Sequence, residues 1–244
     1  MINHLFNKLS YYMTLSEEEK QVLERASTGS VLMEKGEVII NEGERPKYVY
    51  LIEKGWACRY KLLENGDNHI MAYLIPGDLC DVHIAILDEM DHSLRALTPV
   101  TLRKFPADEM RNIMENHHRL ARALFWSTLV DEAVLREWLV NMGTRPAESR
   151  LAHLFCEMLI RSHIAGCAKD NSFEFPLSQA ELGETIGLTS VHTNRVLQKL
   201  RQEGLVSLEK KRLTILDWER LKEFSQFDSI YLHCQNISCQ RSPR

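Results

Sequence analysis

Five glycines divide the segment from residue 31 to residue 105 into short pieces of similar length. They follow one another at intervals of 7, 12, 11 and 11 residues, at Gly36, Gly43, Gly55, Gly66 and Gly77. The pieces between them are rich in β-branched and aromatic residues, as in the run from Tyr48 to Ile52. Turn residues at intervals of about 8–12 positions between such runs are typical of a small β sandwich or barrel.

The segment 65–67 carries the strongest local turn signal of this region. Asn65-Gly66-Asp67 separates two β-rich runs and predicts a tight hairpin. Further strands are expected at 94–97 and 100–105, on either side of Pro99. Before the roll, residues 5–27 are predicted to be helical, with a capping box formed by Ser16 and Glu19. We therefore assign residues 1–116 to an N-terminal β-roll domain, expected to act as a sensor.

Residues 117–141 contain neither proline nor glycine and predict one long helix of about 37 Å. Its apolar positions at Leu120, Leu124, Leu135 and Trp138 are expected to share one side, with Ala123, Val130 and Val134 alongside. So long a stripe exceeds what one small roll can cover, and a second copy of the same helix is the simplest partner. The alternative is a helix packed wholly within its own chain.

The segment from Gly143 to Pro146 breaks this helix and predicts a hinge between domains. We expect a dimerisation helix over 117–142, a C-terminal domain over 143–224 and a tail over 225–244. The predicted fold class is therefore α+β.

Two short helices after residue 177 carry clear boundary signals. Ser178 and Glu181 form a capping box for the first, which ends at Gly187. Thr189 is the expected N-cap of the second, which ends near Gly204. Gly183 is small where the two helices must approach each other. This arrangement predicts a helix-turn-helix.

A β-hairpin is predicted directly after the second helix, at 205–208 and 212–215, with a charged turn between. The segment from Ser190 to Arg212 contains six Lys and Arg residues but only two glutamates, although the whole chain carries a net charge of −4. A local basic face on an acidic chain indicates a protein that docks one surface on DNA phosphates. Together, the helix pair and the basic hairpin predict a winged helix-turn-helix.

The first turns of the second helix are expected to enter the major groove. Arg195 is the candidate for a guanine edge, Asn194 for adenine and Val191 for a thymine methyl group, with Ser190 on the same face. Backbone phosphates are the expected contacts of the remaining candidates, which are Ser178, Thr189, His192, Lys199 and, on the wing, Lys211.

The order of these parts resembles the Crp/Fnr family of bacterial transcription regulators over nearly the full length. Three turns of the roll resemble a cyclic-nucleotide-binding domain, which is a double-stranded β-helix; they lie at Lys35-Gly36-Glu37, Lys54-Gly55 and Pro76-Gly77-Asp78-Leu79. Residues 177–205 resemble the family's helix-turn-helix, and this half is the more specific. The resemblance implies a homodimer on double-stranded DNA, a partly palindromic operator and control of transcription through RNA polymerase.

Two departures from the family's pattern bear on cofactors. Members that bind cyclic AMP carry a glutamate and an Arg-Ser or Arg-Thr pair where this chain has Val82 and His92-Ser93. We therefore do not expect cyclic AMP to bind, because both strong polar anchors are missing. The oxygen-sensing branch holds an iron–sulfur cluster on N-terminal cysteines, whereas the first cysteine here is Cys58, so that cluster is not expected either. Haem and a metal ion remain open, given ten histidines and six cysteines.

The candidate effector pocket is unusually polar; its members are Cys80, Asp81, Val82, His83, His92 and Ser93. If this segment is a strand, Asp81 and His83 point to the same side. One hypothesis is a metal or redox site on Cys80, Asp81, His83 or His92, and the alternative is a polar rim with internal hydrogen bonds. Near the end of the chain, three interpretations are open for Cys234 and Cys239: a switchable disulfide, a metal site, or a frayed tail with two free thiols.

The remaining function classes are judged by the motifs and segments that the sequence lacks. No CxxC motif occurs, so the six cysteines are expected to be free thiols in a cytoplasmic protein. We find no apolar run long enough for a membrane span and no signal peptide. A cupin-like metal enzyme would need a His-x-His pair on one strand, where this chain has Asp81 and His83, and a DNA-free signalling adaptor would not need Arg195 or the basic face. We therefore expect no catalytic residues and no enzymatic activity.

Overall fold

The computed structural model describes residues 2–87 and 89–234. Two four-stranded antiparallel sheets form the β-roll, in the orders β1-β8-β3-β6 and β2-β7-β4-β5. The strands are β1 Ser30–Met33, β2 Val38–Ile40, β3 Tyr48–Lys54, β4 Ala57–Leu62, β5 Asn68–Leu74, β6 Leu79–Cys80, β7 Ser93–Ala96 and β8 Val100–Pro106. The roll predicted from glycine spacing is confirmed, and the hairpin at Asn65-Gly66-Asp67 joins β4 to β5.

Gly55 and Gly77 show why the roll needs glycine at its turns. All five regularly spaced glycines have positive φ. At Gly55 a Cβ atom would also lie 2.2 Å from the backbone oxygen of Pro99, and at Gly77 one would lie 2.7 Å from that of His4. These two turns therefore have neither the backbone conformation nor the space for a side chain.

The N-terminal segment differs from the expected single helical stretch. It forms two helices, α1 Asn3–Ser10 and α2 Glu17–Ala26, separated by a turn. The predicted capping box at the start of α2 is confirmed, because Ser16 and Glu19 each accept a backbone hydrogen bond from the other. Capping that stabilises the start of α2 also ends the helical run before it.

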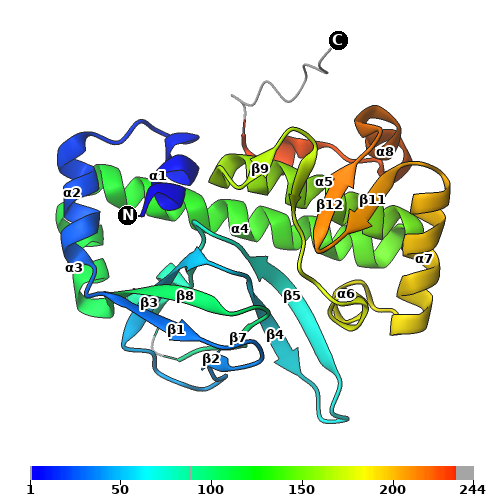
Figure 1. Ribbon diagram of the computed structural model, residues 1–244. Helices are drawn as coiled ribbons and strands as arrows, with labels where there is room; N and C mark the ends of the chain where they lie inside the picture. Colours follow the sequence, from blue (N-terminus) through cyan, green and yellow to red (C-terminus); the bar gives the residue numbers. More distant parts are fainter. Residues whose placement is uncertain (1, 88, 235–244) are drawn as a thin grey trace.

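Helix α4 (His118–Thr144) runs the length of the molecule, and both halves of the chain pack on it (Figure 1). It follows α3 (Ala107–Asn116) and is followed, after Arg145-Pro146, by α5 (Ala147–Ala165). At 27 residues it is about 40 Å long. None of the helices in the described ranges is both long and apolar enough to cross a membrane.

The apolar residues of α4 divide into a buried and an exposed set. Leu120, Leu124 and Trp138 are buried, as predicted. Leu135 was expected beside them but is 46% exposed, because it lies at the edge of a cavity between the roll and α4 and is not covered there. It joins an exposed apolar stripe whose other members are Phe125, Leu129, Leu139, Val140 and Met142. Within the described ranges, 2–87 and 89–234, one face of the longest helix is therefore left uncovered.

The C-terminal domain combines α5 with a four-stranded sheet and three shorter helices. Its elements are β9 Ala168–Lys169, β10 Ser172–Glu174, α6 Gln179–Ile186, α7 Ser190–Gln202, β11 Val206–Glu209, β12 Arg212–Ile215 and α8 Trp218–Ser225, followed by the 3-10 helix η2 Ser229–Leu232. The tail expected from residue 225 packs on the domain over its described part, where Phe227 and Leu232 are buried. Cys239, the second member of the proposed cysteine pair, lies outside the described residues.

Aromatic side chains join the C-terminal domain to the roll. Trp56 of the roll meets Phe175 edge to face, with ring centroids 5.8 Å apart, and Tyr73 of β5 meets Trp138 of α4 in the same way. All four belong to one continuous apolar core. Because buried aromatic pairs contribute beyond the area they cover, this contact holds the two domains in a defined orientation.

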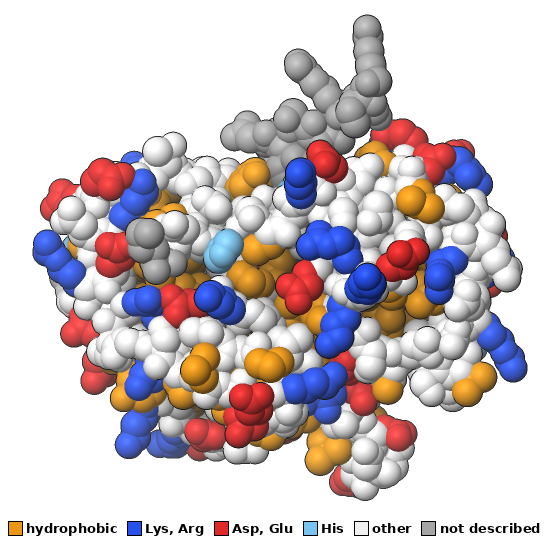
Figure 2. Space-filling model, in the orientation of Figure 1, with side chains coloured by type: hydrophobic (Ala, Val, Ile, Leu, Met, Phe, Trp, Pro, Cys, Tyr) orange, Lys and Arg blue, Asp and Glu red, His pale blue; other side chains and the backbone are white. Residues whose placement is uncertain are grey.

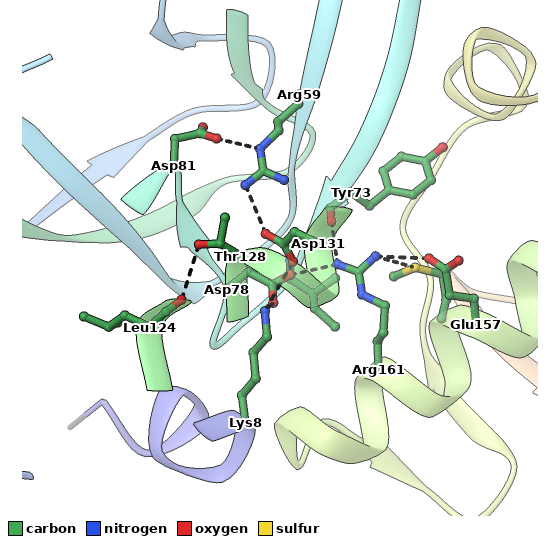
Figure 3. A network of polar contacts seen from close by, with 12 residues as sticks. Lys8, Arg59, Tyr73, Asp78, Asp81, Leu124, Thr128, Asp131, Glu157 and Arg161 are labelled. Atoms are coloured by element: carbon green, nitrogen blue, oxygen red, sulfur yellow. Dashed lines mark hydrogen bonds and ion pairs between the residues drawn. The ribbon is translucent and has the colours of Figure 1, made fainter. Parts of the chain in front are cut away.

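A buried carboxylate on the roll also binds both neighbouring helices (Figure 3). Asp78 accepts from Lys8 of α1 at 2.8 Å and from Arg161 of α5 at 2.9 Å. Arg161 further pairs with Glu157, whose other oxygen accepts from the Trp138 indole. Burial raises the pKa of Asp78, but the charges of Lys8 and Arg161 outweigh it and hold the pKa at about 2.

We predict that Asp78→Asn lowers the free energy of unfolding by about 3–5 kcal/mol, because it leaves Lys8 and Arg161 buried without their anion. The folded pKa of Asp78 lies below the value of about 4 for a free carboxyl group. The ion pairs therefore stabilise the fold fully above about pH 4, and this contribution is lost as the pH falls toward 2. Denaturant unfolding should show the full difference at pH 7 and a smaller one below about pH 4.

Asp108→Asn is the matched control, because the Asp108 side chain is 92% exposed. It should change stability by no more than about 0.5 kcal/mol. Equal effects of the two substitutions would contradict the role assigned to Asp78.

Candidate nucleic-acid interface and effector pocket

Helices α6 and α7 have the predicted caps and turn. Ser178 Oγ accepts from the Glu181 backbone at 3.2 Å, and Glu181 accepts from the Ser178 backbone at 2.6 Å. Thr189 Oγ1 accepts from the backbone of His192 at 3.3 Å, which caps α7. Between the helices, Gly187 adopts the left-handed conformation with a φ of +68°. Local sequence therefore fixes where each helix begins and how the chain turns between them.

Gly183 lies where the two helices come closest. A Cβ atom there would be 2.4 Å from the backbone oxygen of Leu188 and 3.3 Å from Thr193 Oγ1. The apolar contacts around this point come from buried residues of both helices, namely Leu182, Ile186, Val196, Leu197 and Leu200. The pair therefore packs as one rigid unit.

The opposite side of α7 faces solvent. Ser190, Val191, His192 and Arg195 are exposed, and Asn194 is half-buried. Arg195 has no ion-pair partner within the described part of the chain, whereas Lys199 pairs with Glu148 at 3.2 Å. In Figure 2, Lys and Arg side chains lie along the side of the molecule that carries α7. This surface can approach a polyanion without any rearrangement of α7 itself.

The wing is the hairpin of β11 and β12, as predicted. Its turn residues Lys210 and Lys211 both have positive φ, of 48° and 62°. A two-residue hairpin turn of this type demands left-handed residues, which favours glycine or asparagine. Lysines are present instead, and both side chains are exposed at the tip. The turn therefore places two cations at the end of the wing.

The side-chain pairs between the roll and the helix-turn-helix described below all involve α6 and not α7. Arg95 of β7 pairs with Glu184, and the Tyr73 hydroxyl bonds Thr185. Lys35, in the turn before β2, pairs with Glu181 at 2.9 Å. Each contact reaches α6, while the recognition surface of α7 lies at the far edge of the molecule (Figure 1). The domain contact and the surface predicted to bind DNA are therefore separate.

A second candidate site is a cavity of about 370 Å³ between the roll and α4. Four of the predicted pocket residues line it: Asp81, Val82, His83 and His92. Cys80 instead lies in the apolar core of the roll, and Ser93 Oγ accepts from the backbone of Glu42 at 2.9 Å. Those two side chains do not belong to the pocket lining.

The local structure around Asp81 differs from the expected strand. Asp81 has a left-handed conformation with a φ of 57°, and a 3-10 helix, η1 (Val82–Ala85), follows it. The alternation that would align Asp81 with His83 is therefore absent, although the 3-10 turn still brings His83 Nε2 within 3.8 Å of the Asp81 carboxylate. In the described ranges, no three or more His, Cys, Asp or Glu side chains are arranged to hold a metal ion.

Asp81 is paired within the chain. Arg59 Nε donates to one oxygen at 2.9 Å, and His92 Nε2 lies 3.3 Å from the other. Burial raises the pKa of Asp81, but the charge of Arg59 and the contact with His92 hold it at about 2. Burial lowers the pKa of His92, yet Asp81 and Asp91 outweigh this and raise it overall. Burial also lowers the pKa of His83, and for this residue the effect of burial is larger than the opposing effect of the nearby carboxylates, so the pKa is lowered overall.

Sequence reasoning missed Arg59 and Asp131. Arg59 Nη2 lies 3.3 Å from Asp131 of α4, so the arginine bridges the roll and the long helix. A usable signal existed, because an arginine placed between Cys58 and Tyr60 in a strand needs an anion if the fold buries it. The identity of that anion depends on the tertiary fold.

Comparison with known proteins gives matches in both halves. Residues 149–224 match the family described as Crp-like helix-turn-helix domain, and residues 30–117 match the cyclic nucleotide-binding domain. The transcriptional activator protein FnrL of Cereibacter sphaeroides is 25% identical over 198 residues, which cover 80% of this chain and 79% of that protein. The anaerobic regulatory protein of Haemophilus influenzae is 24% identical over 221 residues, covering 90% and 85%. The structure of FixK2 from Bradyrhizobium japonicum superposes with a TM-score of 0.74 at 23% identity, covering 81% of this chain and 96% of that one.

We predict that Gly183→Ala destabilises the protein by about 1–3 kcal/mol, because the added methyl group overlaps the backbone of Leu188. Gly143→Ala is the matched control: Gly143 lies in α4 with no atom within 4 Å of the added carbon. That change should stabilise the helix by up to about 1 kcal/mol. Denaturant unfolding measures both, and a Gly183 variant as stable as the Gly143 variant would refute the close approach.

Proposed function

Because the chain is a transcriptional regulator of the Crp/Fnr type, we propose that it binds a partly palindromic operator as a homodimer and controls transcription through RNA polymerase. The observation that carries this proposal is the exposed face of α7, capped at Thr189 and free of contacts with the roll. The alternatives, a cupin-like metal enzyme and an adaptor that ignores DNA, leave this face and the basic wing without a role.

Base reading is assigned to three residues on the first turns of α7. Arg195 would donate two hydrogen bonds to a guanine edge, Asn194 would pair with adenine, and Val191, 62% exposed, would contact a thymine methyl group. The phosphate contacts fall to Ser178, Thr189, His192, Lys199 and Lys211. Lys199 would exchange its exposed pair with Glu148 for a phosphate, which costs little because exposed ion pairs are weak.

The exposed stripe on α4 supports the homodimer. Its apolar side chains, from Phe125 to Met142, recur at helical spacing and include Leu139, which is 68% exposed. A second copy of α4 packed against this stripe would bury it symmetrically. The two recognition helices would then meet successive major grooves, about 34 Å apart, which is why the operator is expected to be partly palindromic.

We predict that Arg195→Ala weakens operator binding by about 1–3 kcal/mol and relaxes base preference at one position, because a bidentate contact is lost. Lys211→Ala should weaken binding to all sequences alike, because it removes a phosphate contact. The slope of log K against log salt concentration should also fall by about one. Titration of labelled duplexes at several salt concentrations measures both effects.

Arg25→Ala, at an exposed position of α2, is the control and should leave DNA binding unchanged. Unaltered operator affinity in the Arg195 variant would mean that α7 is not the reading helix.

We further predict that Leu139→Glu shifts the protein toward monomers and weakens operator binding with it. Each copy loses about 1.5–3 kcal/mol of apolar burial and gains a carboxylate that must be desolvated. Leu32→Glu is the matched control, at a leucine of β1 that is 78% exposed and far from α4. Sedimentation equilibrium decides the matter: a Leu139 variant that dimerises as tightly as the Leu32 variant would remove α4 from the interface.

A further inference from the structure

The cavity between the roll and α4 has charged walls, but each charge is already matched within the chain. Arg59 contacts two carboxylates, Asp81 and Asp131. His92 lies between Asp81 and Asp91, with its two ring nitrogens 3.3 and 2.6 Å from their oxygens. At the rim, the remaining pairs are Lys61 with Glu42 and Glu132 with Arg136.

This pairing disfavours a charged ligand. An anion such as a phosphate would have to draw Arg59 away from two carboxylates, and the Asp81 side chain, only 1% exposed, would lose its main partner. A cation would compete with Arg59 and His92 for the same carboxylate oxygens. Either exchange leaves a buried charge without its partner, which is strongly unfavourable in a protein interior.

The rest of the lining is mostly apolar, and its polar members are His83 and the two hydroxyls of Ser127 and Thr128. The apolar members are Met71, Ala72, Leu79, Val82, Leu87, Val134 and Leu135. Ser127 of α4 also lines the cavity, is buried, and has no hydrogen-bond partner among the side chains and backbone described. Its neighbour Thr128 donates to the backbone of Leu124. Ser127 is therefore the hydroxyl of the lining that has no partner within the described chain and can bond to an occupant.

We propose that this cavity binds a neutral, largely apolar small molecule that offers a hydrogen-bond acceptor to Ser127. The volume of about 370 Å³ lies within the usual range of small-molecule sites. The apolar walls favour the body of such a ligand, and the internal ion pairs remain intact when it binds. The inference rests on the proposed function only in treating this cavity as the effector site of a regulator.

The cavity wall is connected to the C-terminal domain. Asp131 contacts Arg59 on one side and lies 3.8 Å from Lys8 on the other, and Lys8 shares Asp78 with Arg161 of α5 (Figure 3). A ligand that displaces α4 at Ser127 therefore moves a helix whose next turn holds this ion-pair chain. The occupant acts by packing and leaves the charges in place.

The test titrates the full-length protein with prodan, a neutral naphthalene ketone whose fluorescence reports an apolar site. We expect saturable binding with one site per chain, and a 3- to 10-fold loss of affinity in Ser127→Ala, the usual effect of removing one neutral hydrogen bond. The anionic naphthalene sulfonate ANS and millimolar cyclic AMP should neither displace prodan nor shift the melting temperature. Displacement by either anion would overturn the proposal.

Variants that fill the cavity with a large side chain test whether the probe binds there. Ala72→Trp should abolish prodan binding, and Met71→Trp, a smaller change of volume, serves as a second filling variant should the first fail to fold. Leu32→Trp adds a tryptophan to the exposed face of β1 and should bind prodan as the wild type does. Equal binding by a folded filling variant and the Leu32 variant would refute the site.

Operator binding is measured on the same samples. Absence of prodan binding with operator binding intact would overturn this inference alone. Absence of operator binding by the wild-type protein would overturn the proposed function, whatever the probe does.

Discussion

The buried carboxylate of Asp78 fixes the relation between three parts of the chain. A carboxylate can remain ionised in a protein interior only if cations meet it there. Here those cations come from α1 and from α5, while Asp78 itself lies in a turn of the roll. Arg161 carries the constraint further, because it also pairs with Glu157, which accepts from Trp138 of α4 and from Tyr231 near the end of the described chain. The orientation of the helix-turn-helix therefore depends on one charged centre more than 100 residues away from it in sequence.

A second consequence concerns α6. This helix must pack against α7 to hold it, and it must also face the roll, so its two sides serve different purposes. Leu182 and Ile186 are buried in the apolar core that α6 shares with α7, while Glu184 and Thr185 contact Arg95 and Tyr73 of the roll. The contact of α6 with the roll therefore combines these polar pairs with buried apolar residues of the same core, Tyr73 among them. It lies apart from the exposed face of α7.

The parts of the structure that follow from local chemistry could be predicted from the sequence. The caps at Ser16, Ser178 and Thr189, the turn at Gly187 and the wing all rest on interactions within a few residues, and the structure contains each of them. The conformation of Asp81 could not be predicted in this way. Its left-handed backbone is stabilised by Arg59 and His92, which lie 22 and 11 residues away. Likewise, the exposure of Leu135 on α4 depends on where the roll docks, which helical periodicity alone does not specify.

The same non-local pairing determines what the effector pocket can recognise. The resemblance to cyclic-nucleotide-binding domains implies a carboxylate and a guanidinium for the ligand at positions where this chain has Val82 and His92. Here a carboxylate and a guanidinium are also present, as Asp81 and Arg59, but they bind each other. Because His92 and Asp131 complete the charge balance, a ligand gains little from the charges of the pocket and must bind through shape, apolar contact and Ser127. A signal that enters by this route would reach the DNA-binding domain by moving α4, because the charged side chains that the structure describes in the pocket already have partners within the chain.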